Sequence, residues 1–141
     1  MFLDYKSDYS EVSYLKEDDL LIVTWNDYTW DMSFESFKKE LLFKIELVKK
    51  FRPSTHLVDS RYFSYSIIPE EQEWISQHIF PEYAKNGVKK LAFIICADKV
   101  SQMSIEQSIQ EDQTGQFSVR YFSNLPAARD WLRPKPSFST I

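Results

Sequence analysis

The feature that most constrains the fold is an uninterrupted apolar run, Leu91 to Ala97, in a chain of 141 residues. A strand that is apolar on both sides has to be buried on both faces, which is typical of a central strand in a parallel sheet. Two further apolar runs, Leu20 to Trp25 and Thr55 to Ser60, are separated from it by segments with helical spacing. Alternation of strands and helices predicts an α/β fold with right-handed crossovers.

The full order that the sequence predicts is β-β-α-β-α-β-α-β-α, with five strands in a mostly parallel sheet. Residues Tyr9 to Leu15 alternate weakly and precede a short charged turn, which predicts an antiparallel strand at the edge. Ser33 is a good N-cap for a helix that runs to about Phe51. In that helix, Phe43 points away from the apolar stripe and is either a lone exposed residue or part of a self-association surface.

The second half of the chain carries clear start and stop signals. Pro69 suits the first turn of a helix, and Pro81 should kink or end that helix because proline lacks an N–H group. Gly87 follows as a stop signal. Ser104 with Gln107 resembles a capping box and predicts a short helix from there. A last strand is expected near 117–122 and a last helix after it.

Length predicts a single domain over 1–133, followed by a flexible tail at 134–141. The net charge of -4 and the lack of a basic run make nucleic acid an unexpected partner. The only cysteine is Cys96, which fits a reducing compartment. Charged residues occupy positions 4, 6 and 8, where a signal peptide needs an apolar core, and no run is long enough to span a membrane. We therefore expect a cytoplasmic protein.

Polar side chains follow the predicted strands at their carboxyl ends, which is where open α/β sheets usually bind ligands. Asp59, Ser60 and Arg61 come directly after a buried run, and the aromatic pair Tyr62 and Phe63 follows them. Arg can hold a carboxylate or phosphate in a fork, and Ser can be phosphorylated. The alternative is a local turn bonded to its own backbone. Two residues that follow other strands, Asn26 and Asp98, complete the candidate binding site for a ligand or partner.

Other reactive residue types have simpler explanations. The two histidines, His56 and His78, belong to no recognisable ligand motif, so we expect no metal site. Cys96 lies in an apolar run, where a thiol is usually inert. The three glutamates at 70, 71 and 73 suit the first turn of a helix. We expect no catalytic residues and no cofactor, because the sequence lacks the serine elbow, the Walker loop and the dinucleotide glycine fingerprint.

Several stretches resemble the small STAS-type proteins of the SpoIIAA-like group, also described as STAS/SEC14-like. They are the strand end Leu57 to Arg61, the helix start Pro69 to Trp74, the pair Phe80 and Pro81, the stretch Val100 to Glu106, and the ending Tyr121 to Ser123 with Ala128 to Leu132. The resemblance spans roughly 9–132. It implies a sheet covered mainly on one face by helices, and a protein without enzymatic activity.

In the anti-sigma antagonists of the wider fold, Asp-Ser-Ser/Thr-Gly follows this strand, and a partner kinase phosphorylates the second hydroxyl residue. This chain matches at Asp59 and Ser60 and then departs, because Arg61 stands at the hydroxyl position and Tyr62 replaces the glycine. Phosphorylation of Ser60 would therefore occur only as a displaced substitute for that of the family's second hydroxyl residue.

The sequence leads to three functional hypotheses. The first is a non-enzymatic regulatory module that binds a protein partner, or itself, through the strand-end loops and the aromatic segment Tyr62 to Tyr65. The second is a binder of a small apolar or lipid-like ligand, held in a cleft at the carboxyl ends of the strands. The third is a phospho-regulated switch at Ser60.

Overall fold

The computed structural model describes residues 3–110 and 117–133. Its centre is a mixed sheet with the strand order β1-β2-β3-β4-β5-β6. The strands are β1 (Tyr5–Lys6), β2 (Ser10–Leu15), β3 (Leu20–Trp25), β4 (Thr55–Asp59), β5 (Lys90–Ile94) and β6 (Ser118–Phe122). Strands β1 to β3 pair antiparallel, and β3 to β6 pair parallel. The predicted α/β class and mostly parallel sheet are confirmed.

The number of strands was predicted wrongly. Within the described residues the sheet has six strands and not five, because the short β1 adds itself to β2. The strand at residues 10–15 is therefore not the edge of the sheet. Hydrogen bonds from the side chains of Tyr5 and Ser7 to Glu40 hold the β1 segment against a helix, an interaction between residues more than thirty positions apart. A two-residue strand that depends on such contacts has no pattern of its own in the sequence.

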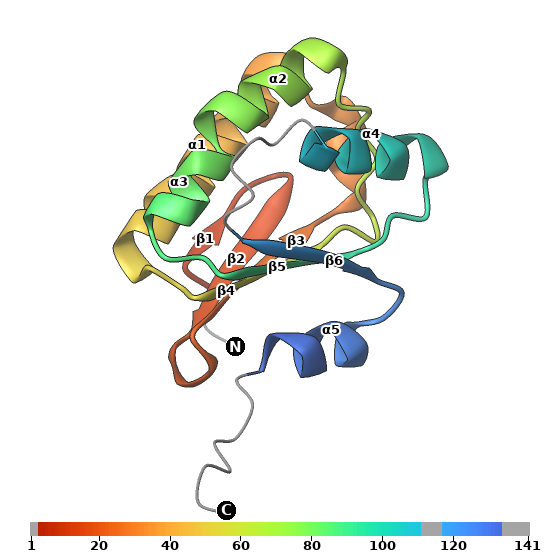
Figure 1. The fold of residues 1–141 in the computed structure, drawn as a ribbon. Helices are drawn as coiled ribbons and strands as arrows, with labels where there is room; N and C mark the ends of the chain where they lie inside the picture. The colour runs from red at the N-terminus through yellow and green to blue at the C-terminus, as the bar shows by residue number, and fades with distance from the viewer. Residues whose placement is uncertain (1–2, 111–116, 134–141) are drawn as a thin grey trace, which may run out of the picture.

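The helices form a layer on one face of the sheet and a single helix on the other (Figure 1). The layer contains α1 (Phe34–Phe51), α2 (Pro69–His78), α3 (Phe80–Lys85) and α4 (Lys99–Gln110), and α5 (Leu125–Leu132) lies on the opposite face. Two short 3-10 helices, η1 (Lys16–Asp18) and η2 (Asp27–Asp31), flank β3. Helices mainly on one face agree with the expectation from the family resemblance.

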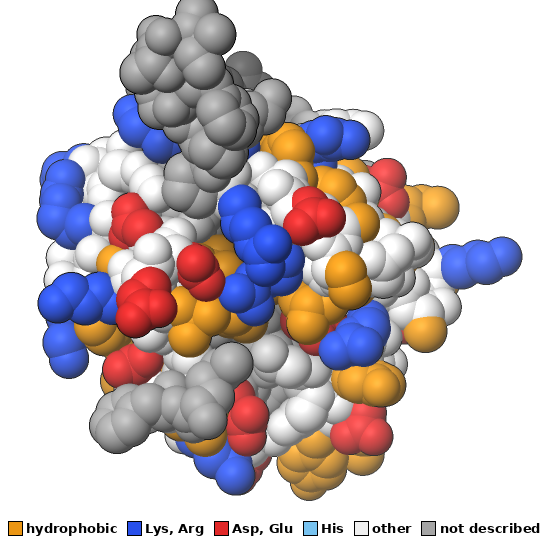
Figure 2. All heavy atoms as spheres, turned by 90° about the horizontal axis from the view of Figure 1, so that it is seen from below, with side chains coloured by type: hydrophobic (Ala, Val, Ile, Leu, Met, Phe, Trp, Pro, Cys, Tyr) orange, Lys and Arg blue, Asp and Glu red, His pale blue; other side chains and the backbone are white. Residues whose placement is uncertain are grey.

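Strand β5 is buried on both faces, as its apolar sequence predicts. Leu91 and Phe93 face the helical layer and belong to the main core. Ala92 and Ile94 face α5, where they form a smaller core with Leu20, Leu57, Ala128 and Leu132. Figure 2 shows the molecule from the α5 side, where basic and acidic side chains are interspersed over the surface.

The start and stop signals are confirmed except at α4. Ser33 caps α1, because its hydroxyl oxygen accepts a hydrogen bond from the Ser36 N–H. The helical segment is interrupted between α2 and α3, just before Pro81. Gly87 has a φ of 99°, in the left-handed region. Helix α4, however, starts at Lys99, so the capping box at Ser104 is wrong. That serine is interior to the helix, and its hydroxyl donates to the Ser101 carbonyl.

Two further predictions concern the ends and surface of the domain. The tail expected at 134–141 lies outside the described residues. Phe43 is 54% exposed and stacks on Tyr5, with 5.1 Å between ring centroids. The exposed apolar surface of Phe43 therefore continues onto Tyr5 in β1. This arrangement is compatible with both interpretations that the sequence left open.

Candidate functional site

The polar residues predicted at the end of β4 point to opposite sides of the sheet. The Arg61 side chain donates from Nη2 to Asp59 Oδ2 at 2.7 Å and from Nε to Asp59 Oδ1 at 3.0 Å. This bond and the nearby carboxylate raise the pKa of Arg61 above its ordinary value. The guanidinium binds a carboxylate of its own chain through the edge formed by Nε and Nη2, so this edge is not free to bind a ligand.

Ser60 lies on the other side, beneath the helical layer. Its backbone N–H donates to the Ile94 carbonyl, and its own carbonyl accepts from the Phe63 N–H. The side chain is completely buried, and its hydroxyl has no hydrogen-bond partner. A kinase would reach this hydroxyl only if the segment after β4 opened.

The remaining predicted residues do not gather around one site. Tyr62 is 59% exposed, whereas Phe63 is buried and packs its ring on Trp25. Asn26 caps η2 by accepting from the Tyr28 N–H, and its amide donates to the Asp8 carbonyl. Asp98 opens α4 by accepting from the Val100 N–H and the Ser101 hydroxyl. The Ser101 bond lowers the pKa of Asp98. Both of these polar side chains are explained by local capping.

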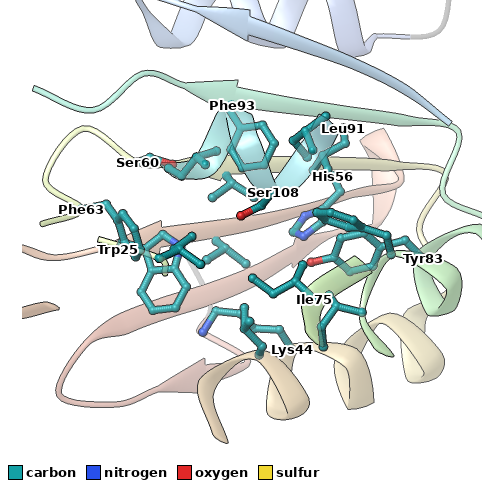
Figure 3. Close-up of a pocket in the computed structure, with 18 of the residues that line it drawn as sticks. Trp25, Lys44, His56, Ser60, Phe63, Ile75, Tyr83, Leu91, Phe93 and Ser108 are labelled. Carbon is teal, nitrogen blue, oxygen red and sulfur yellow. The ribbon is translucent and has the colours of Figure 1, made fainter. Parts of the chain in front are cut away.

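The structure instead contains a cavity between the sheet and the helical layer, with a volume of about 70 Å³ (Figure 3). Its walls are mostly aliphatic and aromatic, and they come from β3, β4, β5, the segment after β4, and the four helices of the layer. The lining residues are Val23, Trp25, Phe37, Leu41, Lys44, His56, Val58, Ser60, Phe63, Ile67, Ile75, Ile79, Phe80, Tyr83, Leu91, Phe93, Ile105, Ser108 and Ile109.

One wall of the cavity is the segment between β4 and α2, which contributes Phe63 and Ile67. Both side chains are buried, so the segment is part of the core. Several polar contacts hold this segment against the helices, including one to α2 and one to α4. The Tyr65 hydroxyl donates to the Glu71 carboxylate on α2, and the Ile67 N–H donates to the Ser104 hydroxyl on α4 at 3.0 Å.

Among the polar groups in the cavity wall, the His56 imidazole places the strictest requirement on a hydrogen-bond partner. It has no exposed surface, and burial lowers its pKa to about 4, so the imidazole is neutral at physiological pH. Its Nδ1 lies 2.9 Å from the Leu21 carbonyl, which can only accept, so Nδ1 carries the proton. The remaining nitrogen, Nε2, is then a bare acceptor, and it has no partner.

A buried ion pair forms another part of the wall. Lys44 Nζ lies 3.2 Å from Glu40 Oε1 and 2.8 Å from the Ser10 hydroxyl, and it sits 4.2 Å above the Trp25 ring. Burial lowers the pKa of Lys44 to about 8. Burial also opposes ionisation of Glu40, but Lys44 and three hydroxyl groups outweigh it and lower the pKa of that carboxyl. The two charges therefore neutralise each other inside the protein.

The sequence predicted two of the cavity residues, Ser60 and Phe63, as binding candidates but missed His56 and Lys44, although part of the signal was present. Strand alternation puts His56, Val58 and Ser60 on one face of β4, and that face is the cavity floor. Lys44 lies seven positions after Phe37 and therefore on the apolar stripe of α1, where an unpaired lysine would be costly. Neither pattern reveals a cavity, because a cavity is space left between elements that are distant in the sequence.

Searches of protein-family models, curated proteins and solved structures found no match to this chain. The STAS resemblance therefore stays a prediction. Within residues 3–110 and 117–133, no group of three or more His, Cys, Asp and Glu side chains is placed to hold a metal ion. None of the helices in the same ranges is long and apolar enough to cross a membrane. What the geometry defines is an α/β domain with an apolar cavity whose wall carries unpaired polar atoms.

Proposed function

We propose that this protein is a non-enzymatic binding domain that holds a small, mainly apolar molecule in the cavity between its sheet and its helical layer. The observation that carries the proposal is the pairing of an apolar cavity with two completely buried polar atoms, His56 Nε2 and Ser60 Oγ, that lack partners. Buried polar groups normally find a partner, because an unsatisfied one costs about 1–3 kcal/mol. A bound molecule can supply it.

The size of the cavity limits the ligand. At about 70 Å³ the space is well below the roughly 150 Å³ of an engineered apolar cavity that binds benzene. It suits a molecule of a few non-hydrogen atoms. A longer, lipid-like ligand would have to displace Phe63 and Ile67, which close one side.

The reactive side chains Cys96, Lys44 and His56 support a binding role over a catalytic one. Burial, followed by the charge of Asp98, raises the pKa of the Cys96 thiol to about 12, so it is not a thiolate at neutral pH. The Lys44 ammonium is occupied by Glu40 and Ser10. His56 could accept a proton only at acidic pH.

The proposal includes the STAS-like topology and a cytoplasmic location. The order of strands and helices, and the placement of α1 to α4 on one face, support the first. The single buried cysteine supports the second.

Titration with n-pentane, followed by NMR of the methyl groups of Val58, Ile75 and Ile105, tests the proposed function. We expect saturable shifts of these methyl signals. The variant Val58→Phe should abolish them, because the added ring occupies the cavity floor. Val100→Phe is a matched control, since Val100 is 62% exposed and does not line the cavity. Absence of saturable shifts in the wild-type protein, with pentane and with every other small probe, would refute the proposal.

A partner-docking role at the strand-end loops is the second candidate function. It is favoured by the exposure of Tyr62, at 59%, and of Ile95, at 40%. The Ala97 N–H donates to the Arg61 carbonyl at 3.2 Å, which holds the two loops side by side. If this surface docks a partner, Tyr62→Ala should remove the partner from material purified under native conditions. Phe63 should be left intact in such a test, because its buried ring supports the fold.

A further inference from the structure

The two unpaired polar atoms of the cavity make different demands on a ligand. His56 and Ser60 are four residues apart in sequence, which places them about 13 Å apart along an extended strand. A molecule of a few atoms can therefore meet only one of them. The Ser60 hydroxyl can donate or accept, and it can rotate toward neighbouring groups. The neutral His56 ring can only accept at Nε2, in a fixed direction, so the ligand must bring a donor there.

A second polar group lies beside this acceptor. The Tyr83 ring meets the His56 ring edge-on, with 5.2 Å between centroids. Figure 3 shows the Tyr83 hydroxyl directed into the same part of the cavity as the imidazole. Burial raises the pKa of this hydroxyl far above the ordinary value, so it keeps its proton. Tyr83 can therefore donate to a ligand atom that also donates to His56.

The charged groups in and behind the cavity wall further limit the class of ligand. Lys44 already makes contacts with Ser10 and Glu40, and His56 is neutral, so the wall offers no free cation to a carboxylate. The Glu40 carboxylate in turn accepts from Tyr5, Ser7 and Ser10 as well as Lys44, so no free anion awaits an amine. Burying an unpaired ion is far more costly than burying a neutral polar group. The cavity therefore selects against charged molecules.

We infer that the ligand is a small neutral alcohol, whose hydroxyl group donates to His56 Nε2 and accepts from Tyr83, and whose apolar part packs against Val58, Ile75 and Phe93. This inference rests on the proposed function and defines the ligand class for the same cavity. The hydroxyl group is the smallest group that combines one donor with acceptor lone pairs at a single atom. A water molecule could also bridge the two side chains, and the experiment has to separate that case.

Four probes of five non-hydrogen atoms test the inference on the full chain: 1-butanol, methyl propyl ether, propanoate and n-pentane. They are similar in size and differ in whether they donate, only accept, carry charge or are purely apolar. Dissociation constants come from NMR titration of the cavity methyl groups. We expect 1-butanol to bind about tenfold more tightly than the ether, since the ether leaves His56 unpaired. Propanoate should show no saturable binding.

The nitrogen NMR signals of the imidazoles give a readout that affinity alone does not. On addition of 1-butanol, the Nε2 signal of His56 should move in the direction of an accepted hydrogen bond, and the ether and pentane should leave it in place. The exposed His78 is an internal control. Tyr83→Phe removes only a hydroxyl group and should reduce the preference for 1-butanol over the ether. His56→Asn can keep a donor toward Leu21 and should reduce the preference as well.

The outcomes separate the two claims. If pentane and 1-butanol bind equally and the Nε2 signal is unchanged, the alcohol inference is wrong and the binding function stands. If the Nε2 signal already shows an accepted hydrogen bond without probe and no probe alters it, a resident water fills the role and the inference is again wrong. Tightest binding by propanoate would overturn the charge argument. Failure of all four probes would remove the proposed function itself.

Discussion

The burial of His56 predicts that the protein loses stability on mild acidification. In the folded chain the pKa of His56 is lowered from 6.5 to about 4, chiefly by burial. Between these two pH values the unfolded chain binds a proton that the folded chain does not. The free energy of unfolding therefore falls as the pH decreases. Stability from this group is complete above the unfolded pKa and is lost as the pH approaches the folded pKa.

The magnitude follows from the size of the shift. Each pKa unit corresponds to about 1.4 kcal/mol, so the whole window amounts to about 3 kcal/mol. Between pH 7 and pH 5 the expected loss is about 2 kcal/mol. The carboxyl groups of Asp19, Glu40 and Asp98 have lowered pKa values and act only at still lower pH. For a marginally stable domain, a loss of this size is a large fraction of the total.

Urea unfolding at pH 7, 6 and 5, followed by circular dichroism, measures this loss. His56→Asn should flatten the pH dependence, because asparagine does not titrate and its amide can still donate toward the Leu21 carbonyl. His78→Asn removes an exposed histidine and should leave the slope as it is in the wild type. Equal slopes in the wild type and His56→Asn would refute the reasoning, because His56 would then titrate alike in the folded and unfolded chains.

Three further predictions concern stability and are measured by urea unfolding at pH 7. Glu40→Ala should lower the free energy of unfolding by about 3–5 kcal/mol, because it leaves Lys44 buried without its partner. The double variant Glu40→Leu with Lys44→Met should recover most of that loss, and no recovery would contradict the explanation. Leu132→Ala should cost about 2–5 kcal/mol, because this buried side chain helps attach α5 to the sheet; a loss below that range would mean that α5 contributes little. Asp98→Ala should cost about 1 kcal/mol through the lost cap of α4, and an unchanged midpoint would show that the Val100 and Ser101 bonds are unimportant.

Local patterns were sufficient to predict most of the elements. The two-sided apolar run at β5, the cap at Ser33 and the break ahead of Pro81 all depend on residues close in sequence, and the structure confirms them. The same local patterns predicted the wrong start for α4, because Asp98 and Ser104 both carry side chains that can cap a helix. In the structure Asp98 caps the start of the helix, and the Ser104 hydroxyl instead accepts from the Ile67 N–H.

The sequence alone determined an α/β domain with a mostly parallel sheet, because strand and helix periodicities are properties of neighbouring residues. Only the tertiary structure decided that Arg61 folds back onto Asp59 and that the Ser60 hydroxyl is buried without a partner. Only the tertiary structure paired Lys44 with Ser10 across 34 positions and placed His56 in the wall of a cavity. Cavities and buried pairs depend on how segments that are far apart in the sequence pack against one another. The side-chain periodicity of one segment carries no information about that packing.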